Sequence, residues 1–187
     1  MSTPTPTPTS QTEPLAQAAE DERDHRVALV TGATAGIGKA FAVRLANDGW
    51  DLVLVARDEG RLKELASSLS DSYQVRVNIL MADLSTVAGA ETVEERLRST
   101  RIDLLVNNAG LSLNTPFLKS TVDRELYLLS VNVQAVMRLT HAALAGMVAA
   151  NPATDETLMI APLPRETIPT SAEWVNLITA WTFTESK

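Results

Sequence analysis

The sequence predicts an α/β protein built on a doubly wound parallel sheet with helices on both faces. From Arg26 onward, short apolar runs alternate with segments of helical periodicity, an order typical of parallel strands joined by crossover helices. The runs at residues 27–30 and 50–56 are almost entirely apolar, as expected of strands that are buried on both faces. No internal repeat is found beyond this alternation.

Each element follows from its local pattern. Four strands are expected at residues 27–30, 50–56, 78–82 and 102–106, and a short fifth strand at residues 157–160. The first helix follows a glycine-rich turn, carries Ile37, Phe41 and Leu45 on one face, and ends at Gly49. Apolar spacing predicts further helices at residues 62–69, 87–97, 121–149 and 172–182.

The segment TGATAGIG at residues 31–38 joins the first strand to the first helix. Gly32 permits a tight turn, Gly36 allows backbone N–H groups to approach a phosphate, and Gly38 allows the helix to pack closely on the strand. The positive end of the helix dipole would then face the anion. This segment predicts a dinucleotide site formed by six residues: Gly32, Thr34, Ala35, Gly36, Ile37 and Gly38.

Four motifs occur in the order found in the short-chain dehydrogenase/reductase family, which residues 26–150 resemble. They are the G-x-x-x-G-x-G turn after Thr31, Asp-Leu at 83–84, Asn-Asn-Ala-Gly at 107–110, and Asn132 within LSVNV. The resemblance implies a Rossmann-like fold, a nicotinamide dinucleotide cofactor, and hydride transfer between the cofactor and a carbonyl or alcohol substrate. The substrate itself is unknown.

Arg57 follows the second strand, whose tip lies near the adenosine ribose in this architecture. A carboxylate there would bind the 2′-hydroxyl of NAD, whereas a guanidinium pairs with a 2′-phosphate. NADP(H) is therefore expected in preference to NAD(H). The alternative is a solvated surface arginine with Asp58 or Glu59 nearby.

The resemblance also implies contacts with the rest of the cofactor. Asp83 would accept the adenine amino group, with the Leu84 backbone beside the ring. Asp83 and Ser85 are also candidates to cap the next helix, and both roles can hold together. Asn107 is expected to brace neighbouring strands. Three residues are expected to line the cofactor ribose: Asn108, Ala109 and Gly110.

The catalytic group implied by the resemblance is Asn, Ser, Tyr and Lys, with the last two spaced as Tyr-x-x-x-Lys. Asn132 matches the asparagine, which in the family kinks its helix and holds a water of the proton relay; alternatively it is a packing residue. Tyr73 and Tyr127 are followed four residues later by Val77 and Val131, so the sequence contains no Tyr-x-x-x-Lys.

Two registers are open for residues 151–187, a divergent segment with four prolines and no glycine. In one, residues 183–187 replace Tyr-x-x-Ser-Lys by Phe-Thr-Glu-Ser-Lys, which makes Ser171 and Lys187 weak catalytic candidates. In the other, which we favour because it keeps a strand at 158–160, the serine, tyrosine and lysine positions are all lost. Both registers remove the proton donor that carbonyl reduction requires. The sheet is expected to be incomplete at its C-terminal edge.

Three hypotheses about function remain open. The chain is a truncated or frame-shifted product of a reductase gene; it is a non-catalytic NADP(H)-binding protein or a partner subunit of a full-length relative; or it turns over substrate with another proton donor, such as water.

Composition limits the remaining possibilities. The 187 residues suffice for one domain, and the Thr/Pro-rich residues 1–24 are expected to be a disordered tail. A net charge of −7 disfavours nucleic acids and anionic membranes as partners, and no apolar run reaches the roughly 20 residues that span a bilayer. The absence of cysteine excludes disulfides and thiolate sites and fits a cytoplasmic location. His25 and His141 are separated and predict no metal site. A homo-oligomer through the long helix is possible.

Overall fold

The computed structural model describes residues 26–150 and 159–160, which form a parallel five-stranded sheet in the order β3-β2-β1-β4-β5. The chain runs outward from β1 to β3, then crosses back to place β4 on the other side of β1. This confirms the predicted Rossmann-like doubly wound fold. The strands are β1 (Val27–Thr31), β2 (Asp51–Ala56), β3 (Val77–Met81), β4 (Leu104–Val106) and β5 (Met159–Ile160).

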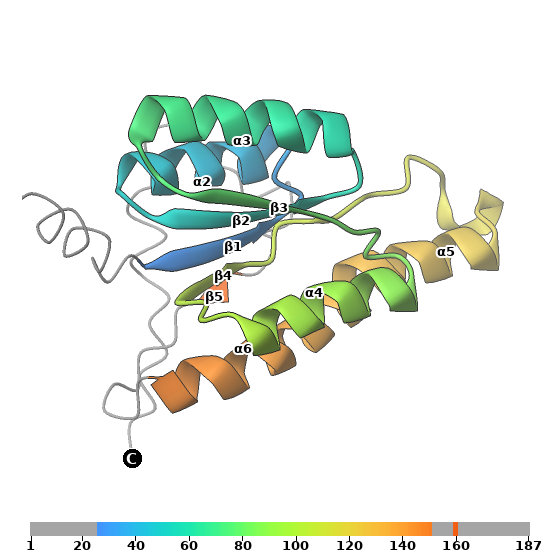
Figure 1. Cartoon of the computed structure of the whole chain (residues 1–187). Coiled ribbons are helices and arrows are strands. Elements are labelled where there is room, and N and C mark those ends of the chain that lie inside the picture. The colour runs from blue at the N-terminus through green and yellow to red at the C-terminus, as the bar shows by residue number, and fades with distance from the viewer. Residues whose placement is uncertain (1–25, 151–158, 161–187) are drawn as a thin grey trace, which may run out of the picture.

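Two pairs of helices cover the two faces of the sheet (Figure 1). On one face lie α2 (Gly36–Asn47) and α3 (Glu59–Tyr73); on the other lie α4 (Val87–Ser99) and α6 (Val136–Ala150). Between β4 and α6 the chain forms the 3-10 turn η1 (Phe117–Lys119), α5 (Val122–Leu129) and the π-helical segment η2 (Ser130–Ala135). The segments α5, η2 and α6 follow one another without a break and form one long helix, as the sequence predicted. Its first part, α5, extends beyond the sheet (Figure 1).

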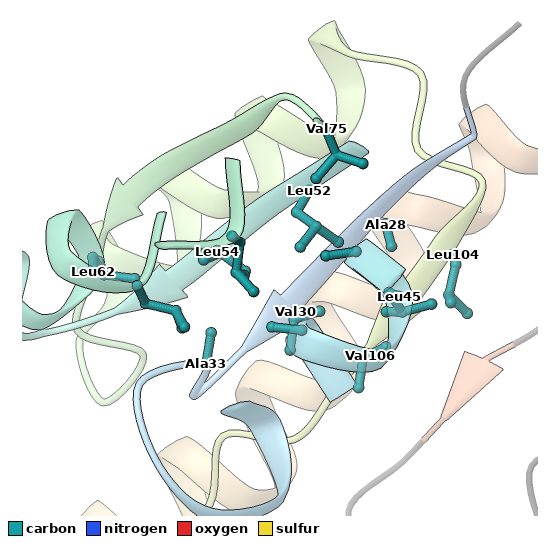
Figure 2. Packing of buried hydrophobic residues seen from close by; sticks show 14 residues of the cluster. Ala28, Val30, Ala33, Leu45, Leu52, Leu54, Leu62, Val75, Leu104 and Val106 are labelled. Atoms are coloured by element: carbon teal, nitrogen blue, oxygen red, sulfur yellow. The ribbon is translucent and has the colours of Figure 1, made fainter. Parts of the chain in front are cut away.

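A hydrophobic core lies on each face of the sheet because successive strand side chains point to opposite sides. Figure 2 shows the core beneath α2 and α3, where Val30, Leu54 and Leu62 are fully buried. The opposite core contains Leu29 and Leu105, packed under α4 and α6. The continuous burial of β1 and β2 explains why their sequences are apolar runs rather than alternating patterns.

The apolar stripes of two helices are only partly buried. In α2, Leu45 is buried and Phe41 packs against the core, but Ile37 is exposed. The long helix buries a line that includes Val131 and Leu139. The larger side chains of its apolar stripe are exposed: Leu126, Leu129, Val133, Met137 and Val148.

The predicted strand at 102–106 is shorter than expected and begins at Leu104. Before it, the Asp103 carboxylate accepts a hydrogen bond of 2.8 Å from the Val27 N–H, and the Asp103 N–H donates to the Val27 carbonyl at 2.8 Å. The expected 1–24 tail and the 172–182 helix lie outside the described residues, as do residues 157 and 158 of the fifth strand. Among the described helices, none is long and apolar enough to cross a membrane.

Candidate dinucleotide-binding site

The glycine turn after β1 has the geometry that its sequence predicts. Gly32 adopts a φ of +65°, and a Cβ there would lie 2.9 Å from the Ala109 backbone. At Gly38 a Cβ would lie 2.3 Å from both the Gly32 carbonyl oxygen and the Asn108 amide nitrogen. Glycine at these two positions therefore lets β1, α2 and the segment after β4 come into close contact.

The N-terminus of α2 is open toward the carboxyl edge of the sheet. Gly36 adopts a φ of +53°, and no atom lies within 4 Å of the position that its Cβ would occupy. The N-cap residue is Ala35, which forms no side-chain capping bond, and the first turn carries no acidic side chain. The first backbone N–H groups of the helix are thus left for an anion, and this cradle fits a dinucleotide pyrophosphate.

The ends of β1 and β4 are held together by side-chain hydrogen bonds. The Thr31 hydroxyl accepts bonds of 3.0 Å from the backbone N–H groups of Asn108 and Ala109. The Asn108 amide donates to the carbonyls of Thr31 at 3.0 Å and Gly32 at 3.2 Å. Asn108, expected to line the ribose, therefore also fixes the shape of the turn.

Asn107 was expected to brace neighbouring strands. In the structure it is buried, and its amide donates to the Thr140 hydroxyl of α6 at 3.1 Å. It therefore joins the end of β4 to the helix layer. Asn107 meets a helix instead of a strand because the doubly wound topology places α6 over the end of β4.

Arg57 directly follows β2, and its guanidinium donates a hydrogen bond of 2.8 Å to the phenol oxygen of Tyr127 on α5. The neighbouring carboxylates are paired elsewhere: Asp58 contacts Arg61, and Glu59 contacts Lys63. Arg57 is exposed, as in the alternative of a solvated surface arginine, but it pairs with neither neighbouring carboxylate. Those two carboxylates start α3 and pair with residues of their own helix.

Asp83, which follows β3, lies near this guanidinium. Its carboxylate accepts hydrogen bonds from the Ser85 backbone N–H at 3.0 Å and the Ser85 hydroxyl at 2.7 Å. Burial acts to raise the pKa of Asp83, but the two Ser85 bonds and the charge of Arg57 outweigh it, so the pKa is lowered. Asp83 is thus an anion at neutral pH.

The predicted capping role of Asp83 and Ser85 is wrong. The N-cap of α4 is Thr86, whose hydroxyl accepts a hydrogen bond of 3.0 Å from the Gly89 N–H. Asp83 and Ser85 instead form the local turn that precedes the cap. A helix cap and a local turn both use a side chain with an oxygen acceptor just before a helix. Residue type alone therefore did not distinguish the two roles.

Asn132 lies within the π-helical segment η2 and holds the chain that leaves β4. Its side-chain oxygen accepts a hydrogen bond of 2.9 Å from the Leu111 N–H, and its amide donates to the Leu111 carbonyl at 2.7 Å. The widened helical turn and the paired bonds occur at one place, as is common where a π-bulge marks a functional site. Gly110 lies beside it, with its Cβ position 3.4 Å from the Asn132 side-chain oxygen.

The remaining predicted residues are distributed around the turn. Ala35 and Ile37 are exposed at the start of α2, and Thr34 is half-buried before it. Leu84 is buried in the core under α4 and α6. Ser171 and Lys187, the weak catalytic candidates, lie outside the described residues. Tyr127 was missed as a site residue because nothing in its local sequence places it beside Arg57, 70 residues away.

A doubly wound sheet with an open glycine turn at its carboxyl edge defines the class of Rossmann-like nucleotide-binding proteins. Within that class, this chain belongs to the short-chain dehydrogenase family, whose family model matches residues 26–154.

Known relatives match about two thirds of the chain. "Inactive hydroxysteroid dehydrogenase-like protein 1" of Homo sapiens is 37% identical over 128 residues, or 66% of this chain and 38% of that protein. "Very-long-chain 3-oxoacyl-CoA reductase-A" of Danio rerio is 35% identical over 124 residues, or 64% of this chain and 39% of that protein.

A solved structure of a short-chain dehydrogenase is also similar to this chain. The short-chain dehydrogenase from Sphingobium yanoikuyae in complex with NADPH is 42% identical, with a TM-score of 0.66 over 67% of this chain and 50% of that chain. This chain thus spans between 38% and 50% of the lengths of these three proteins.

Proposed function

We propose that this chain binds NADP(H) at the carboxyl edge of its sheet. The observation that carries the proposal is the open N-terminus of α2, where Ala35 forms no side-chain capping bond and no atom lies within 4 Å of the Gly36 Cβ position. Arg57 at the end of β2 supports the 2′-phosphorylated form, because a guanidinium pairs with phosphate. The NADPH bound to the Sphingobium yanoikuyae relative is consistent with this preference.

When bound, the nicotinamide group supplies a hydride. The residues of this chain bind and orient the cofactor. The α2 N-terminus holds the pyrophosphate and Arg57 holds the 2′-phosphate, while Asn132 fixes the segment after β4 through its two bonds to Leu111. Polarising a carbonyl and delivering a proton would require further groups, and the 187 residues contain no Tyr-x-x-x-Lys. Binding without catalysis is therefore the function that this site supports best.

A second candidate function is reduction of a carbonyl or oxidation of an alcohol by this chain. The observation that favours it is Asn132, which occupies a π-helical turn beside the site, and one relative is named as a reductase. Steady oxidation of NADPH with a panel of carbonyl compounds, lost in Asn132→Ala, would support this activity. No turnover above the uncatalysed rate would exclude it for that panel.

Thermal melts with and without NADPH test the binding proposal. At about 100 times its Kd, a ligand adds about 2.7 kcal/mol to the free energy of unfolding, or a rise in Tm of about 5 to 10 °C for a chain of this size. Gly36→Asn should lose most of this rise, because the new side chain enters the cradle. Asparagine tolerates a positive φ, so the variant should still fold.

Gly49→Asn is the matched control. Gly49 also has a positive φ, +79°, and open space at its Cβ position, but it follows the other end of α2. Gly49→Asn should lower the Tm of the free protein about as much as Gly36→Asn does, but it should keep the rise in Tm with NADPH. Absence of a rise in the unmodified protein, or an equal rise in Gly36→Asn, would rule out the proposed site.

A further inference from the structure

We propose that Tyr127 on α5 is a specificity-determining residue, which donates a hydrogen bond to the 2′-phosphate of the cofactor together with Arg57. This inference rests on the proposed NADP(H) site and extends it to a helix that the sequence did not connect with the adenosine end. Its basis is the 2.8 Å contact between the Arg57 guanidinium and the Tyr127 phenol oxygen.

The contact leaves donors available on both side chains. A guanidinium has five N–H donors and uses one of them here, and the phenol accepts through its oxygen while keeping its O–H proton to donate. Tyr127 retains about one third of its surface exposed, so a ligand can reach it. A phosphate placed against the pair would meet two kinds of donor from two elements, and a phosphate oxygen accepts strongly from both.

Arg57 is not neutralised by an ion pair within the described residues. Within the described part of the chain, no carboxylate forms a salt bridge with Arg57, because Asp58 and Glu59 pair within α3. Asp83, whose charge interacts with that of Arg57, has its carboxylate bonded twice by Ser85. Asp83 is thus held by Ser85, and the guanidinium keeps donors that can pair with a phosphate.

The position of the phenol is fixed by the helix that carries it. Tyr127 lies five residues before Asn132 on the same continuous helix, and Asn132 is bonded twice to Leu111 beyond β4. The phenol is therefore positioned by the segment after β4, and the guanidinium by the end of β2. A 2′-hydroxyl, as in NADH, has no charge and gains much less from the two donors.

The test compares four ligands by calorimetric titration: NADPH, NADH, 2′,5′-ADP and 5′-AMP. In Tyr127→Phe, which removes only the hydroxyl of an exposed side chain, the Kd for NADPH and for 2′,5′-ADP should rise about tenfold, as expected for a hydrogen bond to a charged group. The Kd for NADH and 5′-AMP should change less than about twofold. Tyr73→Phe, on α3, is the control and should change none of the four.

The outcomes separate this inference from the proposed function. An unchanged NADPH affinity in Tyr127→Phe, with a strong loss in Arg57→Ala, would overturn the role of Tyr127 and leave the NADP(H) site standing. Tighter NADPH binding in Tyr127→Phe would show that the phenol competes with the phosphate, which also overturns it. Failure of the unmodified protein to bind NADPH and NADH would overturn both.

Discussion

At the scale of single residues, the three glycines of the turn serve different purposes. Gly32 and Gly36 need a positive φ, whereas Gly38 needs the absence of a Cβ. The sequence predicted the tight turn at Gly32 and the close packing at Gly38, because the order strand, glycine turn and helix leaves few geometries. The approach of a phosphate at Gly36 stays a prediction. Only the structure shows that the Gly38 contact involves the Asn108 amide as well as the turn.

Gly38→Ala should destabilise the fold. Its Cβ would lie 2.3 Å from the Gly32 carbonyl oxygen, which belongs to the backbone of a tight turn and has little freedom to move. Overpacking of this kind costs about 1 to 3 kcal/mol, and we expect the upper part of that range in urea denaturation.

Gly60→Ala is the matched control. Gly60 lies in the first turn of α3, where a Cβ would make an ordinary contact of 3.4 Å with Asp58. Because alanine is the better helix former, this variant should be neutral or stabilised by up to about 1 kcal/mol. Equal stability of the two alanine variants would contradict the close packing described at Gly38.

At the scale of helices and strands, α4 and α6 are joined by a buried ion pair as well as by apolar packing. The Glu94 carboxylate accepts hydrogen bonds from the Arg138 guanidinium of α6 and from Arg98 at 2.8 Å, and Glu91 lies 3.6 Å from Arg138. The hydrogen bond from Arg138 lowers the pKa of Glu94, burial opposes this, and Arg98 lowers it further. This network predicts a pH dependence of stability.

Because the folded pKa of Glu94 lies below its unfolded value of about 4.3, the unfolded chain binds more protons in this range. The stability from Glu94 is therefore present above the unfolded pKa and is lost as pH falls through the folded pKa. Glu94→Gln should be less stable by roughly 1 to 3 kcal/mol at pH 7. The difference should shrink as the pH falls below about 4.

Urea denaturation of both proteins at several pH values measures this difference. Glu95→Gln is a suitable control, because Glu95 is exposed on the same helix. A constant difference between Glu94→Gln and the unmodified protein from pH 7 to pH 3 would show that Glu94 does not titrate as the network requires.

Patterns within one element were predictable, and contacts between distant elements were not. The strands β1 and β2 were recognised because burial on both faces requires apolar runs. The π-helical turn at Asn132 was not visible in periodicity, since an apolar spacing near 3.6 continues through it. Nor does any local pattern reveal that Tyr127 meets Arg57 or that Ile37 is exposed at the start of α2.

At the scale of the whole molecule, the site exists because parallel strands end at the same edge. Residues far apart in sequence, Gly36 after β1, Arg57 after β2 and Asp83 after β3, are collected there by topology alone. The placement of these three residues at one edge of the sheet was therefore predictable from the sequence, and their contacts with a cofactor stay predictions. The groups that would deliver a proton were not found there, and the weak candidates Ser171 and Lys187 fall outside the described residues.

The central claim is that this edge binds NADP(H) and prefers it to NAD(H). Calorimetric titration of the unmodified protein with NADPH and with NADH tests it most directly. We predict one molecule of NADPH bound per chain, with a Kd at least about tenfold lower than that of NADH, because only NADPH pairs with Arg57. No binding of either dinucleotide, or NADH binding as tightly as NADPH, would contradict the account.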